Sequence, residues 1–417
     1  MNLFWHALLA INEEIKDITS VGETLAYTWF GRPNWAYSET AQKYWIGSTK
    51  DTVNGTTQHI TEYDIDTDTY FTTQVGTVFQ KDDHNQSQIL IRESDKRILA
   101  FYVEHNGSAL RWKISTNPLD ASSFGAEKTV NPVASYSYIS PYQASNGNIF
   151  IFFRSYVSAQ TAYIWHYMKS TDGGETFGNL TVFFNNGSVQ PYLIYSQNGD
   201  KLHFAASNGH PQSNAPSNIN VFHFYFDLIA ETLHKSNTDL ITLPAANINM
   251  TQATSVLGND TTWILDISFK NNFPRIIYAY YPSGITTNFI TKELWFIEYD
   301  GTSWVNNQKI SDTMVGYIED DASIQEKCYT GASRFDTSNS DIIWMPKQVN
   351  GILEIHKVDL RNNPIYIEQI TFDSTVNNWR PISVPSPVNN LLWLKNNDYN
   401  MYNDYSITLQ TKTVPVN

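Results

Sequence analysis

The sequence predicts an all-β fold, a seven-bladed β-propeller with four antiparallel strands in each blade. From Gly22 onward, short segments of alternating apolar and polar residues are separated by Asn, Gly, Asp and Ser, with no long helical pattern. Residues 170–177, Ser-Thr-Asp-Gly-Gly-Glu-Thr-Phe, match the Asp-box turn Ser-x-Asp-x-Gly-x-Thr-aromatic. A degenerate copy begins at Ser115, 55 residues earlier. That period is typical of propeller blades and allows six to eight of them.

The first residues are predicted to be separate from the propeller. Residues 1–22 are expected to form a leader with a short helix, and residues 23–417 a single propeller domain. The leader has apolar residues at helical spacing, namely Leu8, Leu9, Ile11 and Ile15. It lacks the basic segment of a signal peptide and runs directly into Glu13 and Glu14. The protein is expected to act extracellularly. Its export would then require either a signal that has been removed or another route, such as a virion.

The first of three hairpins has a histidine on each side of its turn. It is predicted to fold at residues 94–96, between strands at 88–91 and 97–102. His84 and His105 are equidistant from this turn. Because antiparallel pairing places equidistant residues side by side, we expect the two imidazoles to be neighbours.

The second hairpin is predicted at Asn146-Gly147, the strongest short hairpin signal, with positive φ at both central residues. Tyr138 and Arg154 flank it. A two-residue turn would pair Tyr138 with Ser155, so contact with Arg154 requires a bulge or a diagonal approach. A third hairpin, at Asn198-Gly199, has Tyr192 before it and His210 after it. Residues at the open ends of consecutive hairpins are expected to form one active-site mouth.

Composition limits the classes of partner. The chain has 417 residues, of which 41% are hydrophobic and 14% aromatic, and its net charge is −14. The acidic balance argues against nucleic acid as the main partner, and no apolar run is long enough to span a membrane. The single cysteine, Cys328, excludes an internal disulfide framework. The abundant aromatic residues suit both pleated sheets and sugar-stacking surfaces.

An ordered set of short motifs resembles the seven-bladed propeller lyases of polysaccharide lyase families 24 and 25, the ulvan lyases. The similarity spans roughly residues 25–400. Its motifs are Tyr27-Thr28-Trp29-Phe30, Asp82-Asp83-His84-Asn85, Phe101 to Gly107, Ile114 to Pro118, Tyr138-Ile139-Ser140-Pro141, Phe152-Phe153-Arg154, the Asp-box, Gly209-His210-Pro211 and Trp379-Arg380-Pro381.

The resemblance implies cleavage of an anionic uronic-acid polysaccharide by β-elimination, without a cofactor in the chemistry and with a monomer as the expected state. It implies that His84 and Tyr138 are the acid and base groups and that Arg154 neutralises the uronate carboxylate. His105 and Tyr192 assist, and the substrate-binding set is completed by Asn85, Asn106 and Arg380. The chain has Gln86-Ser87-Gln88 and Ser140 where those families have prolines and an asparagine, which predicts an altered substrate pocket.

These residue types suit the reaction. Removing the C5 proton of a uronate creates negative charge beside a carboxylate, and a guanidinium can bind that carboxylate through two hydrogen bonds. A free tyrosine has a pKa of about 10, so Tyr138 needs a nearby cation to act as a base. Histidine needs no such help near neutral pH. The sequence leaves open which group acts on which face of the sugar.

The resemblance also places His210 and His223 at positions that hold a structural Zn²⁺ in family 25. A closed site needs a third ligand, for which His356 and Cys328 are candidates. Two other functions are alternatives. A sialidase-like glycoside hydrolase would need an arginine triad and a tyrosine nucleophile with a carboxylate partner; Arg32-Pro33 resembles the N-terminal arginine of that group, but the paired histidines would have no role. A non-catalytic glycan-binding propeller, such as a phage receptor-binding domain, would not need His84, His105, Tyr138 and Arg154 to converge on one pocket.

Overall fold

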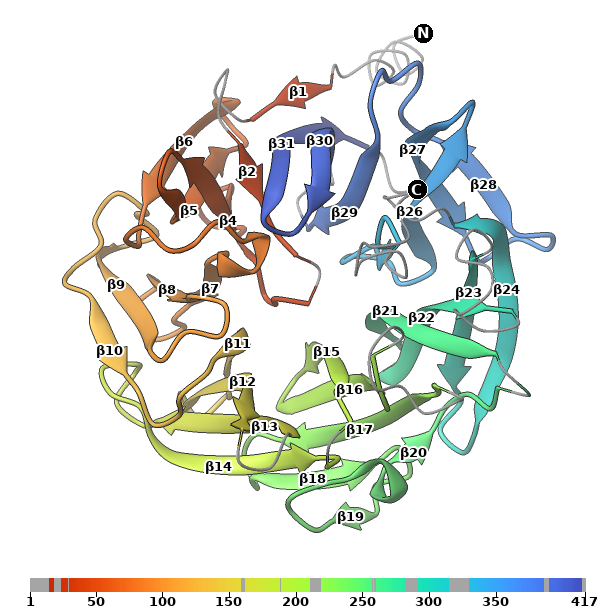
Figure 1. Cartoon of the computed structure of the whole chain (residues 1–417), viewed down its shortest axis with the longest axis horizontal. Helices are drawn as coiled ribbons and strands as arrows, with labels where there is room; N and C mark the ends of the chain where they lie inside the picture. Colours follow the sequence, from red (N-terminus) through yellow and green to blue (C-terminus); the bar gives the residue numbers. More distant parts are fainter. Residues whose placement is uncertain are drawn as a thin grey trace, which may run out of the picture.

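Seven antiparallel sheets surround a central axis in the computed structural model, as Figure 1 shows. The structure describes residues 15–18, 24–28, 30–158, 162–187, 189–210, 219–256, 258, 260–282, 292–314, 330–385 and 390–414. The predicted seven-bladed propeller is confirmed. None of the helices within these ranges is long and apolar enough to cross a membrane.

Each blade is numbered here by its order along the chain. Blade 1 contains β2 (Leu25–Ala26), β3 (Trp35–Ser38), β4 (Lys43–Thr52), β5 (Gly55–Asp64) and β6 (Thr69–Gln74), and blade 2 contains β7 (Gln88–Ile91), β8 (Arg97–Val103), β9 (Leu110–Pro118) and β10 (Lys128–Val130). Blade 3 contains β11 (Ser137–Gln143), β12 (Ile149–Val157), β13 (Ala162–Ser170) and β14 (Gly178–Asn185). Blade 4 contains β15 (Tyr192–Asn198), β16 (Lys201–Ser207), β17 (Val221–Asp227), β18 (Thr232–Lys235), β19 (Leu240–Ile241) and β20 (Thr251–Gln252). Blade 5 contains β21 (Thr261–Lys270), β22 (Phe273–Tyr281), β23 (Lys292–Tyr299) and β24 (Trp304–Met314). Blade 6 contains β25 (Arg334–Phe335), β26 (Ile342–Val349), β27 (Ile352–Asp359) and β28 (Tyr366–Gln369). Blade 7 contains β29 (Asn378–Val384), β30 (Asn390–Met401), β31 (Asp404–Thr413) and β1 (Lys16–Asp17).

The ring closes because blade 7 combines the two ends of the described chain. Its first three strands are C-terminal, and its fourth is β1, which pairs antiparallel with β31 through Lys16 opposite Thr411. Figure 1 shows β1 at the outer edge, beside β31. The predicted leader helix of residues 1–22 is therefore wrong at residues 16–17, whose strand pairing completes a sheet. Residues 1–14 and 19–22 lie outside the described residues.

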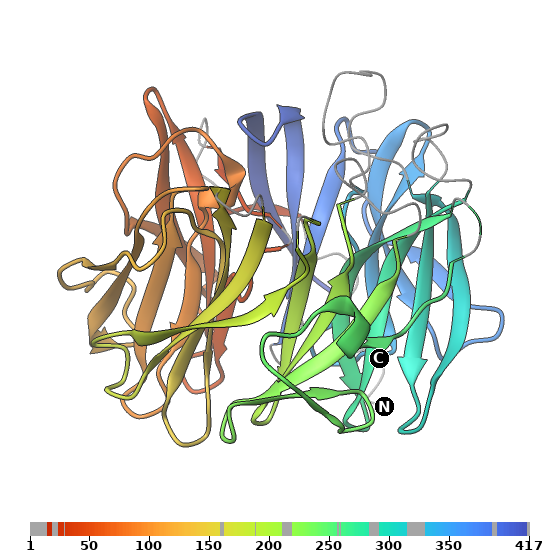
Figure 2. The same ribbon diagram turned by 60° about the horizontal axis from the view of Figure 1, so that its bottom comes forward.

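Strand burial follows position within the blade. The second strand of blade 3, β12, reads Ile-Phe-Ile-Phe-Phe-Arg and is buried along this whole run, since sheets cover both of its faces. The fourth strand of blade 1, β6, is rich in threonine and mostly exposed. Figure 2, turned from the view of Figure 1, shows the strands of neighbouring blades standing side by side around the axis.

The Asp-box packs blade 3 against blade 2. Asp172 accepts hydrogen bonds from the backbone N–H of Thr176 at 3.0 Å and from its hydroxyl at 2.6 Å. Gly173 and Gly174 have φ of 73° and 88°, which explains the glycines. The ring of Phe177 then meets Trp112 of blade 2 edge to face, with centroids 5.2 Å apart.

Two predicted turns differ in detail from expectation. At Asn146-Gly147 only Gly147 has positive φ, and residues 145–147 form a three-residue loop between Ala144 and Asn148. At the third hairpin, Asn198 pairs with Lys201, so the two-residue loop is Gly199-Asp200. Both sites are hairpins, but each asparagine occupies a different turn position from the one predicted.

The first strands of the blades line the axis with their starts at one end. At that end, the hydroxyls of Tyr138 on β11 and Tyr192 on β15 lie 3.5 Å apart. Further along the same two strands, the rings of Tyr142 and Tyr195 have centroids 6.2 Å apart. We call the two ends of the axis the start end and the far end.

Candidate active site

The two histidines predicted to be neighbours stack at the start end. His84 lies in the 3-10 turn η1 (Asp83–Asn85), just before β7, and His105 follows β8, which pairs with β7. Their ring centroids are 4.3 Å apart with an interplanar angle of 10°. The side chains are 11% and 15% exposed, so both rings are reachable from solvent.

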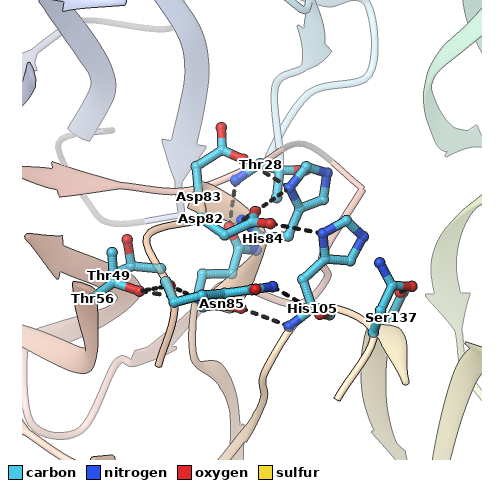
Figure 3. Close-up of polar contacts among 12 residues, drawn as sticks. Thr28, Thr49, Thr56, Asp82, Asp83, His84, Asn85, His105 and Ser137 are labelled. Atoms are coloured by element: carbon cyan, nitrogen blue, oxygen red, sulfur yellow. Dashed lines mark hydrogen bonds and ion pairs between the residues drawn. The ribbon is translucent and has the colours of Figure 1, made fainter. Parts of the chain in front are cut away.

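The Asp82 carboxylate bridges the Nδ1 atoms of the two stacked imidazoles, as Figure 3 shows. One carboxylate oxygen is 2.6 Å from Nδ1 of His84, and the other is 2.8 Å from Nδ1 of His105. A carboxylate only accepts hydrogen bonds, so we assign a proton to Nδ1 of both rings. The Nε2 atoms are then the groups available to a substrate.

The surroundings give the two rings different charges. Burial alone would lower the pKa of His84, but the carboxylates of Asp82 and Asp83 outweigh it and raise this pKa well above 6.5. Burial and the charge of His84 lower the pKa of His105, against the opposing effect of Asp82. Near neutral pH, His84 is therefore an imidazolium, and His105 is neutral with a free proton-accepting Nε2.

Tyr138 lies in a bulge of β11, and this bulge allows its contact with Arg154. Ser137 pairs with Arg154 and Ser140 with Phe152, so one extra residue is accommodated in β11 between them. Tyr138 has a φ of 55°, a left-handed conformation unusual for a tyrosine. Its ring lies 5.5 Å from that of His84 between centroids.

Arg154 is a buried cation surrounded by aromatic rings. Its guanidinium carbon lies 4.6, 4.7 and 4.8 Å from the ring centroids of Tyr138, Tyr163 and Tyr192. The residue is 3% exposed, and its Nε and Nη1 have no hydrogen-bond partner within the described part of the chain. Cation–π contacts hold the guanidinium while leaving donors unused, so it is prepared for an anion.

The Tyr138 phenol carries its proton at rest. Burial and the neighbouring Tyr192 raise the pKa of Tyr138 well above 10.0, although Arg154 acts in the opposite direction. His210 lies against Tyr192, with ring centroids 5.4 Å apart. Burial and then Arg154 lower the pKa of His210 to about 3, so it is neutral. Tyr138 is therefore suited to donate a proton in the free site.

The family model described as a BNR repeat-containing family member matches residues 34–307. The chain belongs to this BNR repeat family. A comparison with curated proteins gave no significant match. The family assignment agrees with the Asp-box and, by itself, indicates no chemistry.

Among solved structures, this BNR repeat protein shares its fold with ulvan lyases. A PL25 ulvan lyase superposes with a TM-score of 0.64 at 16% identity, covering 93% of this chain and 92% of the other. The same family bound to -[GlcA(1-4)Rha3S]- gives 0.63 at 16% identity, with the same coverage. The polysaccharide lyase Uly1 gives 0.61 at 11% identity, covering 96% and 99%. At these identities the likeness establishes the propeller fold.

Three further residues predicted to bind substrate lie in different surroundings. Asn85 is fully buried, and its amide bonds to Gln80, Thr56 and the backbone N–H of His105. Arg380 is 2% exposed, and its Nη1 donates to Asp83 at 2.7 Å. Both side chains hold the backbone or the carboxylates next to the histidines, and substrate contact by them remains a prediction. Asn106, exposed beside His105, remains a candidate contact.

The predicted zinc ligands His210 and His223 lie in separate surroundings. His210 contacts Tyr192 and Trp263, whereas Nε2 of His223 is 3.0 Å from Nδ1 of His203. The candidate third ligand His356 is on β27 in blade 6, and Cys328 lies outside the described residues. The zinc site remains a prediction. Asp82, His84 and His105 have ligand atoms within 4.8 Å of one another, but the Asp82 oxygens already accept from both rings.

Sequence reasoning missed three contributors to the site. Asp82 belongs to the motif Asp82-Asp83-His84-Asn85, but no spacing in the sequence indicated that its carboxylate faces both imidazoles. Tyr402, in the hairpin between β30 and β31, meets the ring of His84 edge to face at 5.5 Å. Tyr163 forms part of the aromatic enclosure of Arg154. The last two come from other strands or blades, so no local pattern could have indicated them.

Proposed function

We propose that this protein is a polysaccharide lyase that cleaves uronic-acid-containing polysaccharides by β-elimination and leaves 4,5-unsaturated uronate ends. The observation that carries this proposal is the buried Arg154, whose unused donors lie beside a phenol and a carboxylate-linked histidine pair. A site of this composition offers an anion contact, a base and an acid together. The -[GlcA(1-4)Rha3S]- ligand of the PL25 relative supports an ulvan-like polymer, which implies extracellular action.

Arg154 would bind the uronate carboxylate. Its desolvated charge would stabilise the enolate-like intermediate that forms when the C5 proton leaves. No carboxylate of the described residues forms an ion pair with this guanidinium, so the substrate would supply its counter-charge. The overall charge of −14 does not exclude an anionic polymer, because the buried Arg154 supplies a positive charge at the site itself.

The protonation states at rest favour His105 as the base and Tyr138 as the acid. Nε2 of His105 would take the C5 proton, the C5–H electrons would form the C4=C5 double bond, and the C4–O4 bond would break. The departing O4 would take the hydroxyl proton of Tyr138, and the resulting phenolate would be stabilised by Arg154 at its ring. His84, as an imidazolium, would keep His105 neutral and donate a hydrogen bond to the substrate. The acid and base pair is then Tyr138 and His105, whereas the resemblance implied Tyr138 and His84.

The test is the ultraviolet absorbance of unsaturated uronate on incubation with ulvan and other uronate polysaccharides. We expect absorbance to rise with the native protein and to fall by about 10²- to 10⁴-fold in rate for Tyr138→Phe and His105→Ala. Arg154→Gln should cost about 10²- to 10³-fold. Tyr136→Phe is the matched control, because this buried phenol lies two residues away and its ring packs on Phe153.

Two other outcomes would replace the proposal. New reducing ends without unsaturated product would indicate a hydrolase. For the sialidase-like alternative, Arg32 would have to bind a substrate carboxylate, but it is ion-paired with Asp266 and lies toward the far end. Binding of the polysaccharide without either product would indicate a glycan-recognition propeller.

A further inference from the structure

A second cavity lies on the propeller axis at the far end. Its volume is about 480 Å³, within the size range of small-ligand sites. Its lining includes residues from all seven blades, among them Trp35, Leu90, Tyr142, Tyr195, Asp266 and Arg334. The cavity is therefore formed only when the blades assemble into the ring.

This cavity is distinct from the candidate active site. On β11, Tyr138 serves the active site and Tyr142 lines the cavity; on β15, Tyr192 and Tyr195 divide in the same way. Phe30 lies in between. Its ring packs against Tyr138 and Tyr192, with centroid distances of 5.6 and 4.7 Å. No residue of the catalytic set proposed above lines the far cavity.

Arg334 is the unusual residue of the cavity lining. It is 5% exposed, and its Nη1 donates to Oδ1 of Asn34 at 3.4 Å. Its Nε and Nη2 have no hydrogen-bond partner within the described structure. These two nitrogens form the parallel edge with which a guanidinium binds a carboxylate through two hydrogen bonds. Burial and the neighbouring Arg32 lower the pKa of Arg334 to about 9, against the opposing effect of Asp266.

The amide and carboxylate groups nearby leave a donor unused beside carboxylates that are already hydrogen-bonded. Nδ2 of Asn34, in a fully buried side chain, also has no partner in the described structure. The carboxylates that line the cavity are already engaged. Asp266 binds Arg32 and the backbone N–H of Phe335, and Asp336 accepts from two backbone N–H groups and an indole. Donors are thus left over where acceptors are satisfied.

We propose that the far cavity is a binding site for a small carboxylate, which pairs with the free edge of Arg334 and accepts a hydrogen bond from Asn34. Aromatic side chains in the lining, including Trp35 and Tyr142, suit a ligand with an apolar face, such as a sugar acid. The carboxylate could belong to a free monosaccharide acid or to a simple organic acid. This inference does not depend on the proposed lyase activity.

The test is calorimetric titration of the full chain carrying Arg154→Gln, so that the active-site guanidinium does not contribute. Sodium glucuronate, sodium acetate and glucose are the probes. We expect a saturable glucuronate site that falls at least about tenfold in affinity when Arg334→Gln or Asn34→Asp is added. Glucose should not bind. Acetate binding as tightly as glucuronate would identify a general carboxylate site, and weaker acetate binding would identify a sugar-acid site.

The variants are chosen so that loss of binding is not loss of folding. Arg334→Gln removes a buried charge without a carboxylate partner, so thermal stability should be kept or raised. Asn34→Asp is nearly isosteric and supplies Arg334 with an internal counter-charge. Asn146→Asp, in an exposed turn, adds the same charge elsewhere and should leave binding unchanged. Equal glucuronate affinity in all variants, or equal binding of glucose, would refute the site.

Discussion

Asp82 accepts hydrogen bonds from two imidazoles at once, and the charge states of the proposed site depend on it. Asp82→Asn would offer one ring an N–H instead of an acceptor, so one histidine must turn or lose its assigned proton. We expect kcat/KM for β-elimination to fall by about 10²-fold or more. The alkaline limit of activity should also move to lower pH, because the pKa of His84 loses its main support.

Glu93→Gln is the control for this substitution, since the Glu93 side chain is 75% exposed at the β7–β8 turn of the same blade. It removes one negative charge without touching the histidines. An Asp82→Asn variant that kept both its rate and its pH profile would show that the hydrogen bonds between Asp82 and the two histidines are only structural. A lower rate with an unchanged alkaline limit would separate ring orientation from charge.

The proposed β-elimination by the native protein should show a pH optimum bounded by its two histidines. Activity should rise as pH increases through the pKa of His105, which lies below 6.5, because only the neutral ring accepts a proton. It should fall only well above 6.5, where His84 loses its charge, since both His84 and Tyr138 have raised pKa values. The measurement is kcat/KM against pH. A profile that falls through pH 6.5 as pH rises would reverse the assignment of acid and base.

At this scale, the sequence predicted which residues meet but not how each is used. The proximity of His84 to His105, and of Tyr138 to Arg154, followed from distances to a turn. Asn85 and Arg380 were predicted to contact substrate, and their burial was not predicted. Burial depends on packing between blades, which pairing within one hairpin does not report. The bridging position of Asp82 was missed for the same reason.

At the scale of elements, hairpins were predictable where their turns carry a backbone requirement. Gly147 and Gly199 both have positive φ at turns located from the sequence. The turn types differed because asparagine tolerates several turn positions. The sequence predicted that contact between Tyr138 and Arg154 requires a bulge, but its place between residues 137 and 140 is set by the register of β11 with β12.

The Asp-box should contribute stability without contributing to chemistry. Phe177 is 8% exposed and packs on Phe101 and Trp112 of the preceding blade. We expect Phe177→Ala to lower the free energy of unfolding by about 3–5 kcal/mol, because it leaves a cavity between two blades. Activity per folded molecule should stay unchanged. Denaturant unfolding and the absorbance assay test the two statements, with Glu175→Ala as the control in the same turn, whose side chain is 49% exposed.

At the scale of the whole molecule, the repeat period and the Asp-box were sufficient for the propeller, because each blade repeats one local pattern. They were not sufficient for ring closure or for the far cavity. The pairing of Lys16 with Thr411 joins residues from opposite ends of the chain. Likewise, Asn34 and Arg334 come from blades 1 and 6. Contacts of this kind appear only when the ring is assembled.

Buried neutral histidines should make the whole propeller labile to acid. Burial lowers the pKa of His166 to about 4 and, with smaller contributions from nearby cations, that of His203 and His210 to about 3. In the unfolded chain these rings titrate near 6.5, so between these values the unfolded state binds more protons than the folded state. Stability is therefore lost as pH falls below about 6.5 and continues to fall toward about 4. His84 does not contribute to this loss, because its raised pKa keeps its stabilisation fully present below 6.5.

We expect the Tm to fall steadily between about pH 7 and pH 4 in thermal unfolding at constant ionic strength. His203→Gln keeps a neutral polar ring-sized group beside His223 and should flatten this dependence, since it removes one of the groups that bind protons on unfolding. His234→Gln is the matched control, because His234 lies on the partly exposed β18 of the same blade. A Tm that is level over this range, or an equal flattening by both variants, would mean that the buried histidines do not govern acid stability.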